Sequence, residues 1–162
     1  EKEEASLVTF RHLALLAQTK SKDEDVWESL GLSKSVSQVL TDRLQRMRTW
    51  IQSKHFPDEL RITILEHPDS DAIGLLDDQN MKVLPDLIAS LRACEWTVKE
   101  IQSAISSAAS KNEIAPRSVY RALSLCIMGR DRGPRLPTIL VELDRDSILS
   151  LLDACIQAKK ES

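Results

Sequence analysis

The sequence predicts an all-α protein made of two packed helical subdomains, together a helical cage, joined by an extended linker. Apolar residues recur at three- and four-residue steps through most of the 162 residues, as on one face of a helix. Prolines, glycines and acidic residues interrupt this pattern between residues 57 and 78. The expected divisions are therefore an N-terminal subdomain over 1–56, a linker over 57–78 and a C-terminal subdomain over 79–162.

Three helices are expected in the N-terminal subdomain. The first follows the apolar stripe that begins at Leu7. Ser21 and Glu24 have the spacing of a capping box that opens the second helix, and Gly31 is placed to end it. The third runs over about 34–54 and ends before Pro57.

The linker contains one short run, 61–65, that alternates apolar and polar residues like a strand. No second alternating run is present to pair with it, and a lone strand leaves its backbone groups without partners. We expect an extended segment here, with one short bridge as the alternative.

The C-terminal subdomain is expected to hold several more helices. Pro85 is predicted either to kink the first of them or to lie near its first turn. The expected N-caps are Asp77 or Asp78, Thr97 in a capping box with Glu100, and Asp144 or Asp146. Pro116 and Pro137 suit the first turns of two helices, and Gly129 is placed to end the helix that Pro116 opens.

Composition limits the function. The net charge is −3, so we expect any nucleic-acid site to be a local basic patch and not the whole surface. No segment has the roughly 18 unbroken apolar residues of a membrane helix, and the first residues do not resemble a signal peptide, which favours a cytoplasmic protein without a membrane partner. Cys94, Cys126 and Cys155 lie among apolar residues and are expected to be buried, reduced thiols.

The sequence contains no recognisable catalytic or metal-binding pattern. His12, His55 and His67 are isolated from one another and from the cysteines, so no metal ligands are predicted. The four glycines form no phosphate-binding motif, and no nucleophile–base pair is evident. We therefore expect no catalytic residues and no cofactor in this chain.

The densest basic loop runs from Gly129 to Pro137 and joins two predicted helices. Arginine is suited to this position because its planar guanidinium holds phosphates and hydrogen-bonds to or stacks on bases. The alternative is that these side chains only pair with the nearby Asp131, Glu142, Asp144 and Asp146. The arginines concerned are Arg130, Arg132 and Arg135, with Arg117 and Arg121 four residues apart on the preceding helix.

Several short motifs occur in an order found in one known family. They are Thr9-Phe10-Arg11-His12-Leu13, Trp50-Ile51 before Phe56-Pro57-Asp58-Glu59, Glu95-Trp96-Thr97, Ile114-Ala115-Pro116, Val119-Tyr120-Arg121-Ala122-Leu123, and Gly129-Arg130 before Gly133-Pro134-Arg135-Leu136. In these motifs the chain resembles the C-terminal, anticodon-binding region of class I lysyl-tRNA synthetases and, more distantly, that of glutamyl-tRNA synthetases. In this family glycine usually follows the last motif, where Pro137 stands here.

This resemblance implies that the chain recognises the anticodon of a lysine-accepting tRNA and is not itself catalytic. ATP and lysine would bind a catalytic Rossmann domain of the same polypeptide, which would join lysine to tRNA. By position in the family loop, Gly133, Pro134, Arg135 and Leu136 would approach the bases, and Arg117, Arg121, Arg130 and Arg132 would neutralise phosphates. The alternatives are a glutamyl-tRNA synthetase domain, a helical protein-interaction module that no longer binds RNA, and a freestanding enzyme.

The aromatic residues are few, 4% of the chain, so recognition is expected to depend on hydrogen bonds and charge more than on stacking. Trp96 precedes a predicted helix and could stack on a base. We favour the alternative that it packs on the core as a helix-terminal staple. Trp27, Trp50 and Tyr120 lie on apolar stripes and are expected in the core.

Overall fold

A computed structural model describes residues 9–32, 36–132 and 135–162 of the chain. All regular structure in these ranges is helical, with no strand, so the predicted all-α class is confirmed. The chain divides into two compact units, Glu1–Ile62 and Thr63–Ser162. The boundary falls inside the segment expected to link two subdomains.

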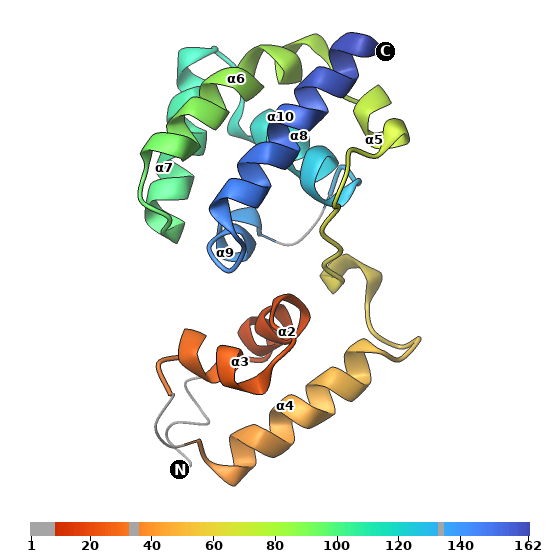
Figure 1. Cartoon of the computed structure of the whole chain (residues 1–162), viewed down its shortest axis with the longest axis vertical. Coiled ribbons are helices and arrows are strands. Elements are labelled where there is room, and N and C mark those ends of the chain that lie inside the picture. The colour runs from red at the N-terminus through yellow and green to blue at the C-terminus, as the bar shows by residue number, and fades with distance from the viewer. Residues whose placement is uncertain (1–8, 33–35, 133–134) are drawn as a thin grey trace. The chain divides into compact units, whose positions relative to one another are not determined.

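In the described residues of the first unit there are three α-helices, labelled in Figure 1, and one short 3₁₀ helix. Its core consists of apolar residues from the three α-helices, with Leu13, Leu16, Leu40 and Leu44 fully buried. The elements are α2 (Phe10–Thr19), α3 (Asp23–Ser29), α4 (Gln38–Ile51) and η1 (Asp58–Leu60).

The predicted capping box at Ser21 is wrong. Helix α3 begins at Asp23, so its N-cap is Lys22, which makes no side-chain capping bond, and Ser21 lies one residue too early. The first turn instead carries three acidic residues, whose charge suits the positive end of a helix. Asp23 also pairs with Arg48 of α4 at 2.9 Å, which fixes this helix end from outside.

Arg48 also closes the C-terminal end of α2. Its Nη1 donates to the backbone oxygens of Ala17 at 3.0 Å and Lys20 at 3.1 Å. These carbonyls have no partner within the helix, because the last turn has no following residues to donate to them. One guanidinium therefore connects α2, α3 and α4.

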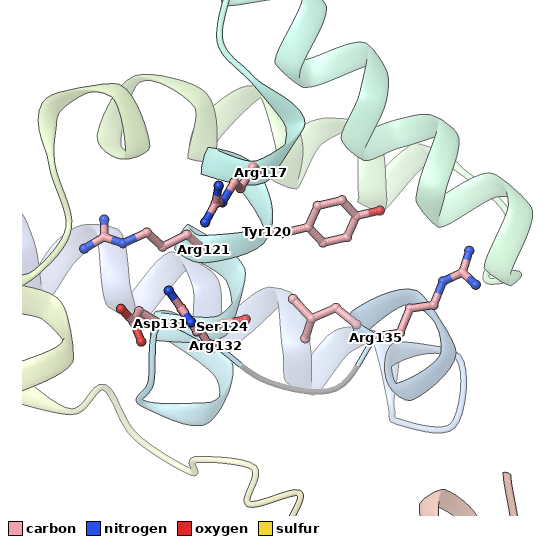
Figure 2. A pocket seen from close by; sticks show the side chains of 8 residues that line it. Arg117, Tyr120, Arg121, Ser124, Asp131, Arg132 and Arg135 are labelled. Carbon is pink, nitrogen blue, oxygen red and sulfur yellow. The ribbon is translucent and has the colours of Figure 1, made fainter. Parts of the chain in front are cut away.

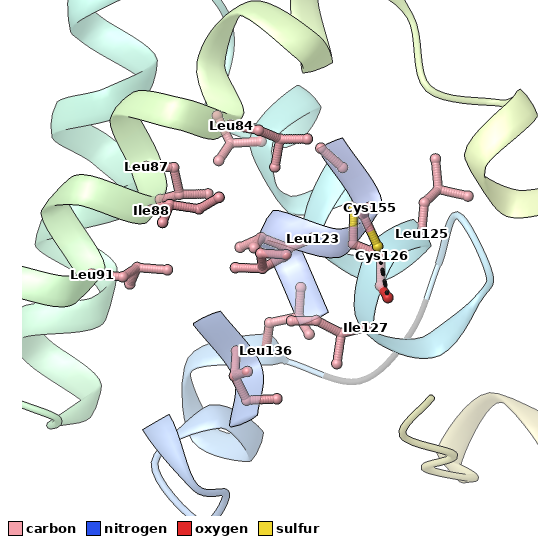
Figure 3. Close-up of a cluster of buried hydrophobic side chains, with 14 of the residues drawn as sticks. Leu84, Leu87, Ile88, Leu91, Leu123, Leu125, Cys126, Ile127, Leu136 and Cys155 are labelled. Carbon is pink, nitrogen blue, oxygen red and sulfur yellow. Dashed lines mark hydrogen bonds between the residues drawn. The ribbon is translucent and has the colours of Figure 1, made fainter. Parts of the chain in front are cut away.

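Apart from residues 133 and 134, which are not described, the second unit contains six α-helices. They surround a larger hydrophobic core, part of which Figure 3 shows. Helix α6 packs against α7, α8 and α10, and α8 also packs against α7 and α10. Leu84, Leu87, Leu91, Leu123 and Leu152 are fully buried between them. The elements are α5 (Ser70–Gly74), α6 (Asp78–Ala93), α7 (Val98–Lys111), α8 (Pro116–Met128), α9 (Leu136–Leu140) and α10 (Arg145–Glu161).

Most predicted boundaries in this unit are confirmed. Asp77, Thr97 and Asp144 each accept a backbone N–H of the first turn of the next helix. Gly129 ends α8 in the left-handed conformation with φ 72°. Pro85 lies well inside α6, so of the two alternatives the first-turn position is wrong, and the kink stays a prediction.

Helix α5 lies within the segment that the sequence analysis interpreted as an extended linker. Its Ala72 and Ile73, with the following Leu76, are buried in the core of the second unit. The run 61–65 is extended and forms no strand, but the backbone N–H of Leu65 donates to the carbonyl of Ile127 at 2.8 Å. The part of this segment that follows residue 62 is therefore built into the second unit.

The three cysteines are free thiols. Cys126 and Cys155 are buried, as predicted, and the Cys155 thiol lies 3.6 Å from the Cys126 carbonyl oxygen (Figure 3). A hydrogen bond with the Cys155 side chain, together with burial, raises the pKa of Cys126. Cys94 is only partly buried. Across the described ranges, none of the helices has the length and apolar character needed to cross a membrane.

Candidate nucleic-acid interface

A cleft of about 620 Å³ lies between α8 and the segment that follows it (Figure 2). Four of its lining residues share one face of α8, because their spacing of three and four residues matches the helical repeat. The opposite wall comes from the end of the basic loop and the start of α9. The lining residues are Arg117, Tyr120, Arg121, Ser124, Asp131, Arg132, Arg135 and Leu136.

The cleft is basic although the chain is acidic. Four guanidinium groups line it against the single carboxylate of Asp131. Arg117, Arg132 and Arg135 are exposed, and none of them makes an ion pair or a hydrogen bond with another described residue. Three cations are therefore available to an anionic ligand.

Within the described ranges, Arg132 and Arg135 do not pair with Asp131, Glu142, Asp144 or Asp146, as the alternative interpretation of the loop requires. Asp144 is occupied elsewhere, because its carboxylate accepts both the N–H and the hydroxyl of Ser147 at the start of α10. These two hydrogen bonds lower the pKa of Asp144. Its charge therefore stabilises the start of α10.

Arg121 differs from the other arginines of the cleft. Its Nη1 donates to Asn80 Oδ1 at 3.3 Å, its Nη2 donates to the Leu75 carbonyl at 3.2 Å, and Asp77 lies 3.8 Å away. Figure 2 shows it extending away from the side on which Arg135 lies. Arg121 thus holds α8 to the turn between α5 and α6, and much of its charge is balanced by Asp77.

Asn80 makes this attachment rigid. It is fully buried, and its amide donates to the Ser118 carbonyl at 3.2 Å while its Oδ1 also accepts the Asp77 N–H at 3.1 Å. A buried amide with its groups satisfied on both sides specifies one geometry. The position of Arg121 therefore follows from the capping network of α6.

Three residues of the cleft were not predicted as site residues: Asp131, which was considered only as a partner for the arginines, and Tyr120 and Ser124 of α8. Tyr120, expected in the core, packs against the core but is partly exposed and lines the cleft, extending toward the side of Arg135 (Figure 2). Ser124 is 5% exposed, and its hydroxyl bonds to no described residue. The spacing of Tyr120 and Ser124 from Arg117 and Arg121 places these four residues on one face of α8, a signal that was present in the sequence.

The remaining predicted residues fall into three groups. Leu136 is 2% exposed and belongs to the hydrophobic core, so its side chain anchors α9 (Figure 3). Arg130 is half-buried and is not among the residues that line the cleft. Gly133 and Pro134 lie outside the described residues.

The ends of the basic loop are fixed by local chemistry. Gly129 starts it with φ 72°, a value that L-residues rarely adopt, and a Cβ there would meet Leu65 Cδ1 at 3.3 Å. At the other end Arg135 is the N-cap of α9, and Pro137 occupies the first turn as the sequence predicts. The loop therefore leaves and re-enters helices at defined positions.

No group of three or more metal-ligating side chains lies close together in the described part of the chain. The cleft instead combines unpaired guanidinium groups, an aromatic ring and a hydroxyl, which are the groups that bind phosphates and unstacked bases. Fold and site together define a helical domain suited to single-stranded RNA.

Comparison with known proteins identifies the family. The family model described as the anticodon binding domain matches residues 12–156, so the chain belongs to the anticodon-binding domain family. The chain is 26% identical over 161 residues to a lysine–tRNA ligase of Thermoplasma volcanium, with 96% of this chain and 31% of the relative covered. It is 29% identical over 160 residues to a lysine–tRNA ligase of Thermococcus kodakarensis, with 88% and 28% covered.

A bacterial relative gives the same result. The lysine–tRNA ligase of Streptomyces coelicolor is 27% identical over 125 residues, with 68% of this chain and 21% of the relative covered. The resemblance to lysyl-tRNA synthetases is therefore confirmed. The chain spans less than a third of the length of these relatives.

Proposed function

We propose that this chain recognises the anticodon of a lysine-accepting tRNA through the cleft between α8 and α9. The observation that carries the proposal is the set of three unpaired arginines, Arg117, Arg132 and Arg135, around a cleft in a member of the anticodon-binding domain family. An anticodon presents unstacked bases on a phosphate backbone. Guanidinium groups bind both parts of such a ligand.

The chain would serve as the non-catalytic part of a lysine–tRNA ligase. This assignment rests on the names of the relatives and on the absence of a recognisable catalytic motif from the sequence. ATP and lysine would bind a catalytic domain elsewhere in the same polypeptide, in the cytoplasm. The present chain then contributes selectivity for tRNA and no bond-forming step.

Each part of the cleft has a distinct task in this proposal. The exposed Arg132 and Arg135 bind phosphates or base edges, and Arg117 extends this contact along α8. The partly exposed ring of Tyr120 offers a face on which one base stacks. The Ser124 hydroxyl both donates and accepts hydrogen bonds, which suits the edge of a base.

A binding titration at low salt tests the proposal. Three RNAs are compared: an unaltered lysine tRNA, the same tRNA with a changed anticodon, and a glutamate tRNA. Selective binding to the lysine tRNA, lost when its anticodon is changed, is expected. Equal binding to all three RNAs contradicts anticodon reading, and no binding at any salt favours a protein-interaction module.

Substitution then locates the site. Arg135→Ala removes an unpaired arginine of the cleft and is expected to weaken binding. Arg92→Ala is the matched control, because Arg92 lies outside the cleft and its ion pair with Asp153 is exposed on both sides. Equal effects of the two substitutions would place the RNA elsewhere on the protein.

A further inference from the structure

Trp96 holds the far end of the helix that follows the basic loop. It lies in the short connection between α6 and α7. Its indole N–H is shared between the carbonyl oxygens of Leu140 at 2.8 Å and Leu143 at 3.2 Å. Leu140 is the last residue of α9, and Leu143 lies in the turn that follows it. The Leu140 carbonyl also accepts the Leu143 N–H at 3.0 Å, so Trp96 adds a second donor to this turn. Trp96 therefore closes α9 from outside.

Arg145 fixes Trp96 in turn. It is the first residue of α10, and its Nη2 donates to the carbonyls of Leu91 at 2.8 Å, Arg92 at 2.9 Å and Cys94. These carbonyls end α6, where the helix dipole favours a cation. The guanidinium carbon lies 5.5 Å from the centre of the Trp96 ring, within the range of a cation–π contact.

Helix α9 depends on such contacts for its position. It has only five residues, too few to be stable as an isolated helix. Leu136, Ile139 and Leu140 bury its inner face, and Trp96 holds its end. Arg135 is the N-cap of α9, so the position of α9 also determines where the Arg135 side chain leaves the backbone.

We propose that Trp96 and Arg145 are positioning residues for the RNA-binding cleft: they hold α9, and through it Arg135, in the orientation that meets the anticodon. This inference rests on the proposed function of the cleft. It assigns a role to the Glu95-Trp96-Thr97 motif, which lines no part of the cleft. Trp96 acts on RNA binding only through Arg135.

The contacts of Trp96 argue against direct base stacking. Its N–H is already used by two backbone carbonyls, its ring packs against the core, and Arg145 lies over the ring. With these contacts Trp96 is suited to hold the end of α9 in place. This agrees with the sequence-based preference for a packed Trp96.

The first test is a double-mutant cycle measured by RNA binding. Trp96→Phe keeps an aromatic ring but removes the N–H, and Arg135→Ala removes the positioned side chain. Arg135→Ala alone is expected to weaken binding about tenfold, as loss of a hydrogen bond to a charged group does. In the Trp96→Phe background the same substitution is expected to have an effect of less than about threefold, because contacts that act as a unit are not additive.

Arg117→Ala provides the comparison for the cycle, because Arg117 lies on α8 and does not depend on α9. Its effect is expected to be the same in both backgrounds. If the effects of Trp96→Phe and Arg135→Ala are simply additive, the positioning role is excluded even though the cleft still binds RNA. Wild-type protein that binds no tRNA refutes the proposed function and this inference together.

The second test needs no RNA. Hydrogen exchange of the segment 135–143 is expected to accelerate in Trp96→Phe, whereas exchange in α8 remains that of the wild type. Arg145→Lys gives an independent variant, because lysine keeps the charge but lacks the planar fork that reaches several carbonyls. Trp27→Phe, in the buried core of the first unit, is the matched Trp→Phe control and should leave 135–143 unchanged. Unchanged exchange in 135–143 for both Trp96→Phe and Arg145→Lys overturns the inference.

Discussion

The salt dependence of RNA binding offers the sharpest prediction for the cleft. Arg117, Arg132 and Arg135 have no described partner, so each can neutralise one phosphate and release its counterion. For single-stranded RNA each neutralised phosphate contributes about −0.7 to the slope of log affinity against log salt, so three give a slope of about −2. Raising the salt from about 50 mM to about 200 mM is then expected to weaken binding about 20-fold.

Arg135→Ala should change this slope by a defined amount. With two phosphates neutralised, the slope falls to about −1.4 and the loss over the same salt range to about sevenfold. Fluorescence anisotropy with a labelled anticodon stem-loop, titrated at four salt concentrations, measures both values. Arg92→Ala should retain the slope of the wild type. A wild-type slope near zero, or equal slopes for the two variants, would refute the assignment of the phosphates to this cleft.

Three further predictions concern the scaffold. Arg48→Met should lower the free energy of unfolding by about 1.5–3 kcal/mol, the range for hydrogen bonds to a charged group, as measured by urea denaturation. Gly129→Ala should lower the stability by about 1–2 kcal/mol in the same assay, because alanine is strained at φ 72° and its Cβ approaches Leu65. Asp144→Ala should lower the Tm at neutral pH. The pKa of Asp144 in the folded protein lies below its ordinary value of 3.8. The Tm difference between the wild type and Asp144→Ala should therefore reach its full size above pH 3.8 and disappear as the pH falls through the lowered pKa.

Helix boundaries were predictable where one residue determines the backbone. Asp77 and Asp144 cap helices through their own carboxylates, and Gly129 ends α8 because it adopts a positive φ. These effects act over three or four residues and are therefore legible in the sequence. The start of α3 was not, because Arg48, 25 residues away from Asp23, contributes to fixing it.

Helix α5 was missed for a related reason. Its five residues show too little of a helical repeat to be distinguished from a loop, and Gly74 and Pro68 suggest a break. Its helical state agrees with the Asp69 side chain, which accepts the backbone N–H groups of two following residues, and with burial of Ile73 against helices far along the chain. Such tertiary burial has no signature in a short segment.

The candidate site was predictable in its charges but not in its geometry. The basic loop and the two arginines on α8 are visible as a local excess of arginine. The sequence does not show that Arg121 is bound to Asn80 and Leu75, or that Leu136 points into the core. Both facts depend on elements that meet only in the folded chain. They show that Arg121 and Leu136 build the cleft, whereas other arginines of the cleft are free to bind a ligand.

In the proposed function, the distribution of charge would favour RNA binding at the cleft. The chain carries a net charge of −3, so attraction of RNA phosphates is expected only where unpaired arginines gather. Arg121 is partly engaged by Asp77, whereas Arg117 and Arg132 beside it and Arg135 on the other side of the cleft remain unpaired (Figure 2). A domain that had to read a few bases would gain nothing from a uniformly basic surface, because such a surface binds any RNA in many registers. On an acidic background, by contrast, other registers would be unfavourable, and the same three arginines would supply both the attraction and the choice of site.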